Sequence, residues 1–247
     1  MLTEQPVTVT IGNRHYAPLG AAILYGVTSR AMPVTSGGGV SIVADVSPQG
    51  WARLFAPSAE ALRDRITPLG ELLPPDAVSA LIDALHASDR GPAVKGLLDA
   101  FFLANLPPPH PAEPLVAAIT ALLADPATQD LAQAAGRIGI SPRALTAATK
   151  RHFGFPPKLL AMRIRFMRAL TPMLTADGPP DFAVIPAGYH DRSHLLRDAR
   201  RFLGLTPRRF LAMDMPYLRA ALRARTLVTG VPTPSLDGTM AGTGTTC

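Results

Sequence analysis

The C-terminal half of the chain contains one residue pattern twice, and the copies are fifty positions apart. The first copy consists of Ser141, Leu145, Lys150, Arg151, Phe153, Gly154, Pro157 and Lys158, and the second consists of Asp191, Leu195, Arg200, Arg201, Leu203, Gly204, Pro207 and Arg208. Each copy has a capping residue before a helix, an apolar anchor within it, a basic pair near its end and a glycine stop. The repeat therefore predicts two copies of one small helical unit.

A further shared feature lies upstream of each copy. Ala135 precedes Gly139 by four residues, and Val184 precedes Gly188 by the same interval. A short helix with a small or apolar residue at this distance from a turn glycine is typical of a helix-turn-helix. Because the feature occurs twice, the sequence predicts two helix-turn-helix units.

Length and composition limit the kind of protein that can contain these units. A chain of 247 residues and 26.1 kDa can form two modest domains, each with its own core. No apolar run approaches the roughly 20 residues that cross a bilayer, and the first residues, MLTEQPVTVT, lack the pattern of a signal peptide. We therefore expect a cytoplasmic protein with no membrane partner. The only cysteine, Cys247, excludes a disulfide framework or a thiolate metal cluster within one chain.

The net charge of +6 is unevenly distributed along the chain. Residues 112–225 contain 17 basic and 8 acidic groups, whereas residues 1–111 contain 7 basic and 9 acidic groups. A positive surplus on the half that contains the repeat favours a polyanion such as DNA as the partner. Charge alone has another explanation, since high-GC bacterial proteins use arginine freely, so the repeat is the stronger argument.

The predicted fold is an α+β N-terminal domain followed by an all-α domain of two helix-turn-helix units joined by a linker helix. In the N-terminal domain, residues 1–109, branched or alternating apolar residues predict strands over residues 7–11, 22–27 and 40–46, with a turn at residues 36–39. After Trp51 the apolar spacing is helical, in the groups Leu54, Ala61, Leu62 and Ile66, then Val78, Leu81, Ile82 and Leu85, then Leu97, Leu98, Phe101 and Phe102.

A proline cluster at residues 107–111 predicts a stiff linker before the all-α domain, residues 112–225. The expected elements are a supporting helix over residues 114–125, a short helix capped by Thr128, a helix from Ser141 to about Phe153, a connecting helix over residues 157–175, a second unit over residues 180–204 and a closing helix over residues 206–215. Pro172 is expected to bend or end the connecting helix near Leu170. Residues 226–247 lack periodicity, which predicts a disordered tail.

The second copy contains a specific series of spaced residues, and the first copy matches it less closely. The series is Gly188, Tyr189, Asp191, Ser193, Arg197, Gly204, Thr206 and Pro207, and the residues that agree in the first copy are Ile140, Ser141, Leu145, Lys150, Arg151, Phe153, Gly154 and Pro157. With these residues, the segment from about 114 to 214 resembles the DNA-binding domain of AraC/XylS-type transcriptional regulators. Residues 23–72 are similar to a short N-terminal domain attached to some of these regulators. The resemblance implies double-stranded DNA as the partner and no cofactor.

Several residues depart from the family pattern. Ala147 and Thr149 stand where the family commonly has Arg and an aromatic residue, so the first recognition helix is expected to contact fewer bases. Leu195 and Ala199 stand where Phe is usual. Pro186 lies within the expected short helix of the second unit, where an interior proline costs about 3 kcal/mol and is expected to kink or shift the helix.

The expected mechanism places two recognition helices about 34 Å apart in successive major grooves of B-DNA. A connecting helix of nearly twenty residues spans roughly 28 Å and can hold them there. The residues expected to contact bases are Arg143, Thr146, Arg192, Ser193 and Arg197, and those expected to contact phosphates are Lys150, Arg151, Lys158, Arg200, Arg201 and Arg208. Arg197 has an alternative role in an ion pair with Asp191 or Asp198. For the residues assigned to phosphates, the alternative is that some are exposed to solvent and contact no DNA.

The preferred interpretation is a sequence-specific DNA-binding regulator that is not an enzyme. RNA polymerase, a small-molecule effector of the N-terminal domain and a second copy of the chain are further candidate partners. One alternative is a regulator that acts mainly through protein partners with degraded DNA specificity; Ala147, Thr149 and Pro186 motivate it. Another is an N-terminal domain that processes its own effector.

Two further groups of residues have both a functional and a structural interpretation. His190 and His194 are four residues apart, as metal ligands on one helix face are, but both fall within the second unit, which already explains them. Trp51, Phe55, Phe101 and Phe102 are candidates for an effector pocket, although apolar residues at helical spacing more often form core.

Overall fold

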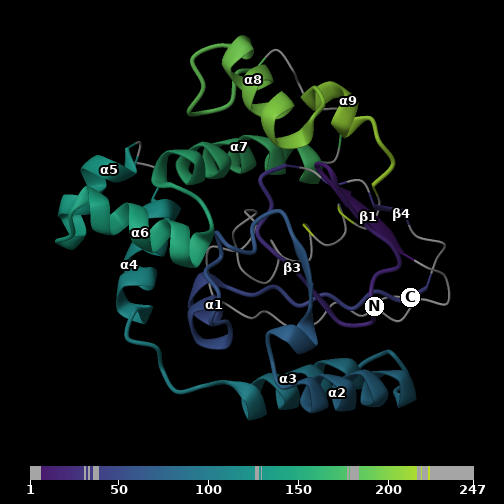
Figure 1. The fold of residues 1–247 in the computed structure, drawn as a ribbon. Coiled ribbons are helices and arrows are strands. Elements are labelled where there is room, and N and C mark those ends of the chain that lie inside the picture. The colour runs from purple at the N-terminus through teal and green to yellow at the C-terminus, as the bar shows by residue number, and fades with distance from the viewer. Residues whose placement is uncertain are drawn as a thin grey trace.

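The structure is a computed structural model that describes residues 7–30, 32, 34–35, 39–125, 128, 130–176, 178, 184–215, 218 and 222. Short strands and helices form the N-terminal part, and the described elements of the C-terminal part are helices (Figure 1). This order confirms the predicted α+β part followed by a helical part. The tail predicted to be disordered, residues 226–247, lies outside the described residues.

Two small antiparallel sheets organise the start of the chain. The strands are β1 (Thr8–Ile11), β2 (Arg14–Tyr16), β3 (Ile23–Tyr25), β4 (Val34–Thr35) and β5 (Ile66–Pro68). One sheet has the order β2-β1-β4, and the other pairs β3 with β5. Between β1 and β2 the chain turns at Gly12, whose φ of +61° is easily accessible only to glycine. Val9, Ile11 and Ile66 are buried in one cluster, so the two sheets share a core.

The strand predictions were correct in part. β1 and β3 lie within the predicted strands at residues 7–11 and 22–27. Residues 41–46 form no strand, because only the preceding Val40 makes a bridge, and Val43 is 81% exposed. A branched apolar run becomes a strand only where another strand pairs with it, and no described strand pairs with residues 41–46, although Val46 packs against the N-terminal core. Residues 36–38 of the predicted turn lie outside the described residues.

The first helix is shorter than its apolar spacing predicts. α1 (Pro48–Leu54) begins at Ser47, whose hydroxyl accepts a backbone N–H of the first turn at 3.0 Å. It ends at Phe55, which is extended, and Pro57 then disfavours helical backbone at the residue before it. The helix predicted to continue to Ile66 is therefore wrong, and Ile66 is buried in β5 instead.

Two longer helices follow at the predicted positions. α2 (Pro75–Ala87) and α3 (Ala93–Asn105), preceded by the single turn η1 (Leu69–Glu71), contain the two later groups of helically spaced apolar residues. They pack against each other and lie side by side in Figure 1. Their inner faces complete the N-terminal core around Trp51 and Phe101.

The C-terminal helices enclose two apolar cores. These helices are α4 (Glu113–Ala124), α5 (Leu131–Ala134), η2 (Ala135–Ile138), α6 (Pro142–Phe153), α7 (Pro157–Thr175), α8 (Arg192–Leu203) and α9 (Pro207–Leu211). The first core contains Ile119 and Leu145, and the second contains Phe166 and Phe202. α7 contributes to both cores, because its Leu160 belongs to the first and its Phe166 to the second.

The cap of α5 differs from the prediction. Asp130, not Thr128, caps this helix, because its Oδ1 accepts the Ala132 N–H at 2.7 Å. The Thr128 hydroxyl instead donates to Asp125 Oδ2 at 3.1 Å and accepts from Arg137. Both residue types are good caps, so the residue adjacent to the helix has the advantage of position.

The two unusual prolines lie in different local structures. Pro172 lies inside α7, which nevertheless continues to Thr175 and does not end near Leu170. Pro186 lies in a turn, where its carbonyl accepts the Tyr189 N–H at 3.2 Å. Residues 184–190 contain no helix, so the expected clash of Pro186 with a helical turn does not arise; residues 179–183, where that short helix was expected to begin, lie outside the described residues.

Two equivalent glycines provide a test of this packing. Gly154 and Gly204 both have positive φ, +77° and +70°, but only at Gly154 would a Cβ collide with a neighbour, Val27 Cγ2, at 2.1 Å. We expect Gly204→Ala to lower the free energy of unfolding by about 1 kcal/mol, from backbone strain alone. Gly154→Ala should cost about 1–3 kcal/mol more, because it adds overpacking. Urea denaturation of both variants, followed by circular dichroism, measures the difference, and equal losses would contradict the close approach of Val27.

Candidate nucleic-acid interface

The two copies of the repeat have the same local structure. α6 and α8 each contain 12 residues and begin after a side-chain cap: Ser141 Oγ accepts the N–H three residues further on at 3.2 Å, and Asp191 Oδ1 does so at 2.7 Å. Both helices end at a glycine in the left-handed conformation, Gly154 and Gly204. The predicted start and stop signals of both helices are thereby confirmed.

The outer face of α6 contains the residues predicted to contact DNA. Arg143 and Ala147 are exposed and Thr146 is half-buried, whereas Leu145 between them is fully buried. Lys150 continues the same stripe, because residues three, four and seven positions apart share a helix face. The Thr146 hydroxyl donates to the carbonyl four residues before it at 2.9 Å, so its lone pairs remain for an external donor.

Ala147 and Thr149, the two residues of the first copy that depart from the family pattern, have different environments. Ala147 is exposed on the outer face but provides no polar group there. Thr149 is fully buried, and its hydroxyl donates to the Thr146 carbonyl at 3.2 Å. The outer face of α6 is therefore poorer in polar side chains than that of α8.

The outer face of α8 is strongly basic. Arg192, Ser193 and Arg197 are exposed, while Leu195 is half-buried against the second core and Ala199 is fully buried. Ala199 stands where a larger residue is usual, and the neighbouring Phe202 stacks on Phe166 of α7 with a centroid separation of 5.4 Å. The exposed residues of α8 and its anchor thus lie on opposite faces, as predicted.

A buried polar network fixes α8 to α7. Arg165 of α7 donates through Nη2 to Asp198 Oδ2 at 2.7 Å, and the Tyr189 hydroxyl donates to the same oxygen at 3.0 Å. The Arg165 Nη2 also lies 2.9 Å from His194 Nε2, and its guanidinium is 5.0 Å from the Tyr189 ring centroid. Asp198 is only 3% exposed, and burial raises the pKa of Tyr189, so its phenol stays protonated and donates. A buried carboxylate of this kind needs such partners.

The network also engages Asp198, one of the two carboxylates that were alternative partners of Arg197. Asp191 caps α8 and Asp198 pairs with Arg165, and among the described residues neither carboxylate pairs with Arg197. Asp198 was considered only as a partner of Arg197, and its pairing with Arg165 was not predicted. The available signal was the position of Asp198, three residues after the inward anchor Leu195, because a carboxylate on the buried face of a helix requires a cation opposite it.

Most residues of the predicted phosphate set are exposed. Those exposed are Arg151, Lys158, Arg200, Arg201 and Arg208. Lys150 is only half-exposed and forms an ion pair, since its Nζ lies 3.1 Å from Glu60 Oε1 of the N-terminal part. The Glu60 contact was not predicted, since no local pattern links residues 90 positions apart.

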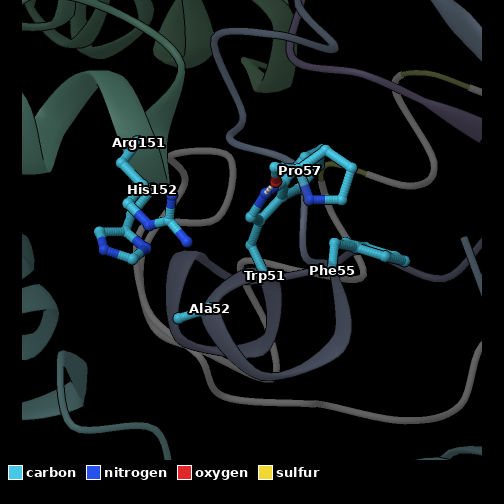
Figure 2. Close-up of a pocket in the computed structure, with 6 residues that line it drawn as sticks. All are labelled: Trp51, Ala52, Phe55, Pro57, Arg151 and His152. Carbon is cyan, nitrogen blue, oxygen red and sulfur yellow. Dashed lines mark hydrogen bonds between the residues drawn. The ribbon is translucent and has the colours of Figure 1, made fainter.

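A small cavity lies where α1 meets the end of α6, and Figure 2 shows it. Its volume is about 10 Å³, and it is lined by Trp51, Ala52, Phe55, Pro57, Arg151 and His152. Trp51 Nε1 donates to the Pro57 carbonyl at 3.0 Å, and the Trp51 and Phe55 rings pack edge to face with centroids 5.0 Å apart. A volume of this size holds about one water molecule. Trp51 and Phe55 are thus core residues, which confirms the structural interpretation of these aromatics.

His152 is a buried histidine at this junction. It is 6% exposed, its Nδ1 has no hydrogen-bond partner among the described residues, and its ring centroid lies 6.2 Å from that of His110 in the linker. Burial lowers the pKa of His152 to about 4, and the charges of Arg151 and His110 act in the same direction. The imidazole is therefore neutral at pH 7 and acts as part of the junction between α6 and α1.

A known protein family includes these helices. Residues 134–213, which include α6, α7, α8 and α9, match a family model described as a helix-turn-helix domain. No curated protein and no solved structure matches the chain. The match covers the outward arginines of both copies, so this region is a DNA-binding domain.

The domain is of the AraC type, which confirms the predicted resemblance to AraC/XylS-type regulators. The chain is accordingly a DNA-binding transcriptional regulator, and the matched family is one of regulators rather than of enzymes. In the described part of the chain, no cluster of three His, Cys, Asp or Glu side chains is arranged to hold a metal ion. None of the described helices has the length and apolar character of a membrane span.

The network around Asp198 leads to a stability prediction. Asp198→Asn removes the charge that faces Arg165, and we expect the free energy of unfolding to fall by about 2 kcal/mol, below the usual range for a buried pair because Arg165 is partly exposed. Asp191→Asn is the matched control, since asparagine caps a helix as well as aspartate does. Urea denaturation of both variants gives the comparison. Equal stability of the two would show that the buried pair does not hold α8.

His152 leads to a prediction of pH dependence. Its pKa is about 4 in the folded chain and 6.5 as the ordinary value, so between these values the unfolded chain binds the additional proton. The free energy of unfolding should therefore fall as the pH decreases through this window. His152→Gln should flatten this part of the profile, whereas His86→Gln, at an exposed position of α2, should leave it unchanged. Thermal melts from about pH 7 to about pH 4.5 test this, and parallel profiles for His152→Gln and the parent would refute it.

Proposed function

We propose that α6 and α8 are two recognition helices that enter adjacent major grooves on one face of a DNA duplex. Residues 112–225 would form the DNA-binding domain, with α7 as the linker between the two helix-turn-helix units. Residues 1–109 would form a sensing or oligomerisation domain. The chain would then bind two neighbouring half-sites that need not be palindromic.

The observation that carries this proposal is the structural equivalence of α6 and α8. Both helices have the same length, caps and glycine ends, and both turn an arginine-bearing face outward while an apolar anchor packs inward. α7 has 19 residues and spans roughly 28 Å at about 1.5 Å per residue. This length is close to the pitch of B-DNA, about 34 Å, which separates successive grooves on one face.

The exposed side chains suggest different tasks. Arg143, Arg192 and Arg197 are assigned to base edges, most simply guanine, where one bidentate arginine contributes about 1–3 kcal/mol of discrimination. Thr146 and Ser193 are assigned to bases as smaller donors and acceptors. The phosphate contacts are assigned to Lys150, Arg151, Lys158, Arg200, Arg201 and Arg208, which orient the protein without sequence preference.

The second helix is expected to provide more of the specificity. Ala147 occupies in α6 the position that Arg197 occupies in α8, fifty residues later. Because Ala147 offers only a methyl group, the half-site under α6 should be the more degenerate of the two. RNA polymerase, a second copy of the chain and a small effector are proposed as further partners, by analogy with regulators of this type.

Selection of binding sites from random duplex DNA tests the proposal and supplies the operator. We expect a bipartite motif with two half-sites about 10 to 10.5 base pairs apart, the more defined of them under α8. A pool without enriched sequence would instead favour a regulator that acts through protein partners. Arg197→Ala should relax the preference at one base pair of the selected site by about 1–3 kcal/mol, whereas Arg201→Ala should weaken binding to all sequences alike.

The salt dependence separates these two variants further. Loss of one phosphate contact should make the slope of log K against log salt shallower by about 0.9, and only Arg201→Ala should show this change. If Arg197→Ala and Arg201→Ala behave alike on operator variants and on salt, the assignment of base and phosphate contacts is wrong.

A further inference from the structure

The C-terminal end of α6 is capped by a segment of the N-terminal part. Ala59 N–H donates to the Arg151 carbonyl at 2.7 Å, and Glu60 N–H donates to the Lys150 carbonyl at 3.1 Å. The last carbonyls of a helix have no partner within the helix, so these two donors satisfy groups that would otherwise need water. We name residues 58–64 the docking segment.

Side chains of the docking segment extend this contact beyond the end of the helix. Arg63 donates through Nη1 to the Gly154 carbonyl at 3.2 Å, and its guanidinium lies 5.9 Å from the Phe155 ring centroid. Ala59 is fully buried, and Phe155 is only 1% exposed. A Cβ on Gly154 would lie 3.2 Å from the Ala59 carbonyl oxygen, so the two backbones are in close contact.

The docking segment also contacts the residues that immediately follow β3. Asp64 N–H donates to the Val27 carbonyl at 3.0 Å, and Gly26 N–H donates to the Arg65 carbonyl at 2.9 Å. A Cβ on Gly26 would lie 1.8 Å from the Leu62 carbonyl oxygen, so no slack exists at this contact. Residues that flank β3 and β5 are thus joined directly to the segment that caps α6.

An ion pair links the same regions at a second place. Arg53 of α1 donates to both carboxylate oxygens of Glu113 of α4, through Nε at 2.5 Å and through Nη2 at 2.9 Å. The hydrogen bonds from Arg53 and from the His110 backbone N–H hold the pKa of Glu113 well below its usual range, at about 2. The carboxylate thus stays charged, and the supporting helix α4, which packs in the same core as α6, is also held to the N-terminal part.

Glu60 places a negative charge at the end of the outer stripe of α6. Its carboxylate lies 3.1 Å from Lys150 Nζ and 3.7 Å from Arg63 Nη1. Lys150 is on the same helix face as Arg143 and Ala147, the face assigned to DNA. The Lys150 ammonium group is therefore already paired with the Glu60 carboxylate, and a DNA phosphate that approaches Lys150 has to replace this carboxylate.

The second unit has no equivalent of this arrangement. Arg200 stands in α8 where Lys150 stands in α6, and it is exposed with no ion-pair partner among the described residues. A Cβ on Gly204 would meet nothing within 4 Å. Within the described ranges, then, the N-terminal part caps α6 but not α8.

We propose that the docking segment positions α6 for DNA binding and that Glu60 restrains this binding by competing with a DNA phosphate for Lys150. This inference rests on the proposed function of α6. It implies that the N-terminal part controls DNA binding by α6 at one of the two half-sites. Displacement of the docking segment would free Lys150 from Glu60, but it would also remove the cap at the C-terminal end of α6. Binding through α8 is not subject to this control.

The test is DNA binding by full-length Glu60→Gln, measured by fluorescence anisotropy on a selected site at several salt concentrations. We expect tighter binding than the parent and a steeper salt dependence, by about 0.9 in the slope of log K against log salt, because Lys150 then makes one further phosphate contact. Between about 50 and about 200 mM salt, this slope corresponds to an additional loss of affinity of about 3.5-fold. Glu60→Ala should act in the same direction, and circular dichroism verifies that both variants are folded.

Two controls separate this competition from a general charge effect. Glu71→Gln removes an exposed carboxylate of η1 and should leave the slope unchanged. On a Lys150→Ala background, Glu60→Gln should no longer have an effect, because the cation for which it competes is gone. Unchanged affinity and slope in Glu60→Gln, together with weaker binding by Lys150→Ala, would overturn the inference and leave the proposed function intact. Absence of duplex binding by the parent chain would overturn the proposed function itself.

Discussion

The arrangement of the DNA-binding region depends on one helix that is shared by two apolar cores. α7 buries Leu160 in the core under α6, and it buries Phe166, Leu170 and Leu174 in the core under α8. Full burial of such a side chain contributes about 1.5–3 kcal/mol, so each core holds its own stretch of α7 independently. Because hydrogen bonds make a helix rigid along its axis, α6 and α8 are placed relative to each other by the length of α7. The prolines tolerated inside and after it change local hydrogen bonds without removing this spacer.

The two units are held by different kinds of interaction. α8 is tied to α7 by Arg165 and Asp198, a buried pair that has lost its hydration and depends on good geometry. α6 is held by backbone hydrogen bonds and by packing against the N-terminal part, with Ala59 and Phe155 at the contact. The position of α8 is therefore an internal property of the DNA-binding domain. The position of α6 depends in addition on residues 58–64, a segment that shortly precedes β5.

The repeat made the helical part of the fold predictable, because capping residues and glycine stops act within a few positions of each other. The bounds of α6, α7 and α8 follow from such local signals, and so do their inward anchors. The small sheets were harder to predict, because strand pairing joins segments that are distant in the sequence. A strand at residues 41–46 would need a partner that no local pattern specifies, and Ile66 pairs with Tyr25 of β3, over forty residues away. The outward arginines of the candidate site follow from helical periodicity. The contacts that position them, Glu60 with Lys150 and Arg165 with Asp198, join distant segments and emerge only when the chain is folded.

The strength of the Glu60–Lys150 pair is suited to competition with DNA. The two side chains are 35% and 42% exposed, and an ion pair at such a surface contributes about 0–1 kcal/mol. A phosphate contact gains the release of a condensed counterion and replaces this pair at little cost. A fully buried pair could not be exchanged in this way, because breaking it would leave a desolvated charge. In the proposed competition, the partial exposure of Glu60 makes it a weak restraint on Lys150, and the backbone hydrogen bonds of Ala59 and Glu60 would keep the end of α6 in place when Lys150 exchanges Glu60 for a phosphate.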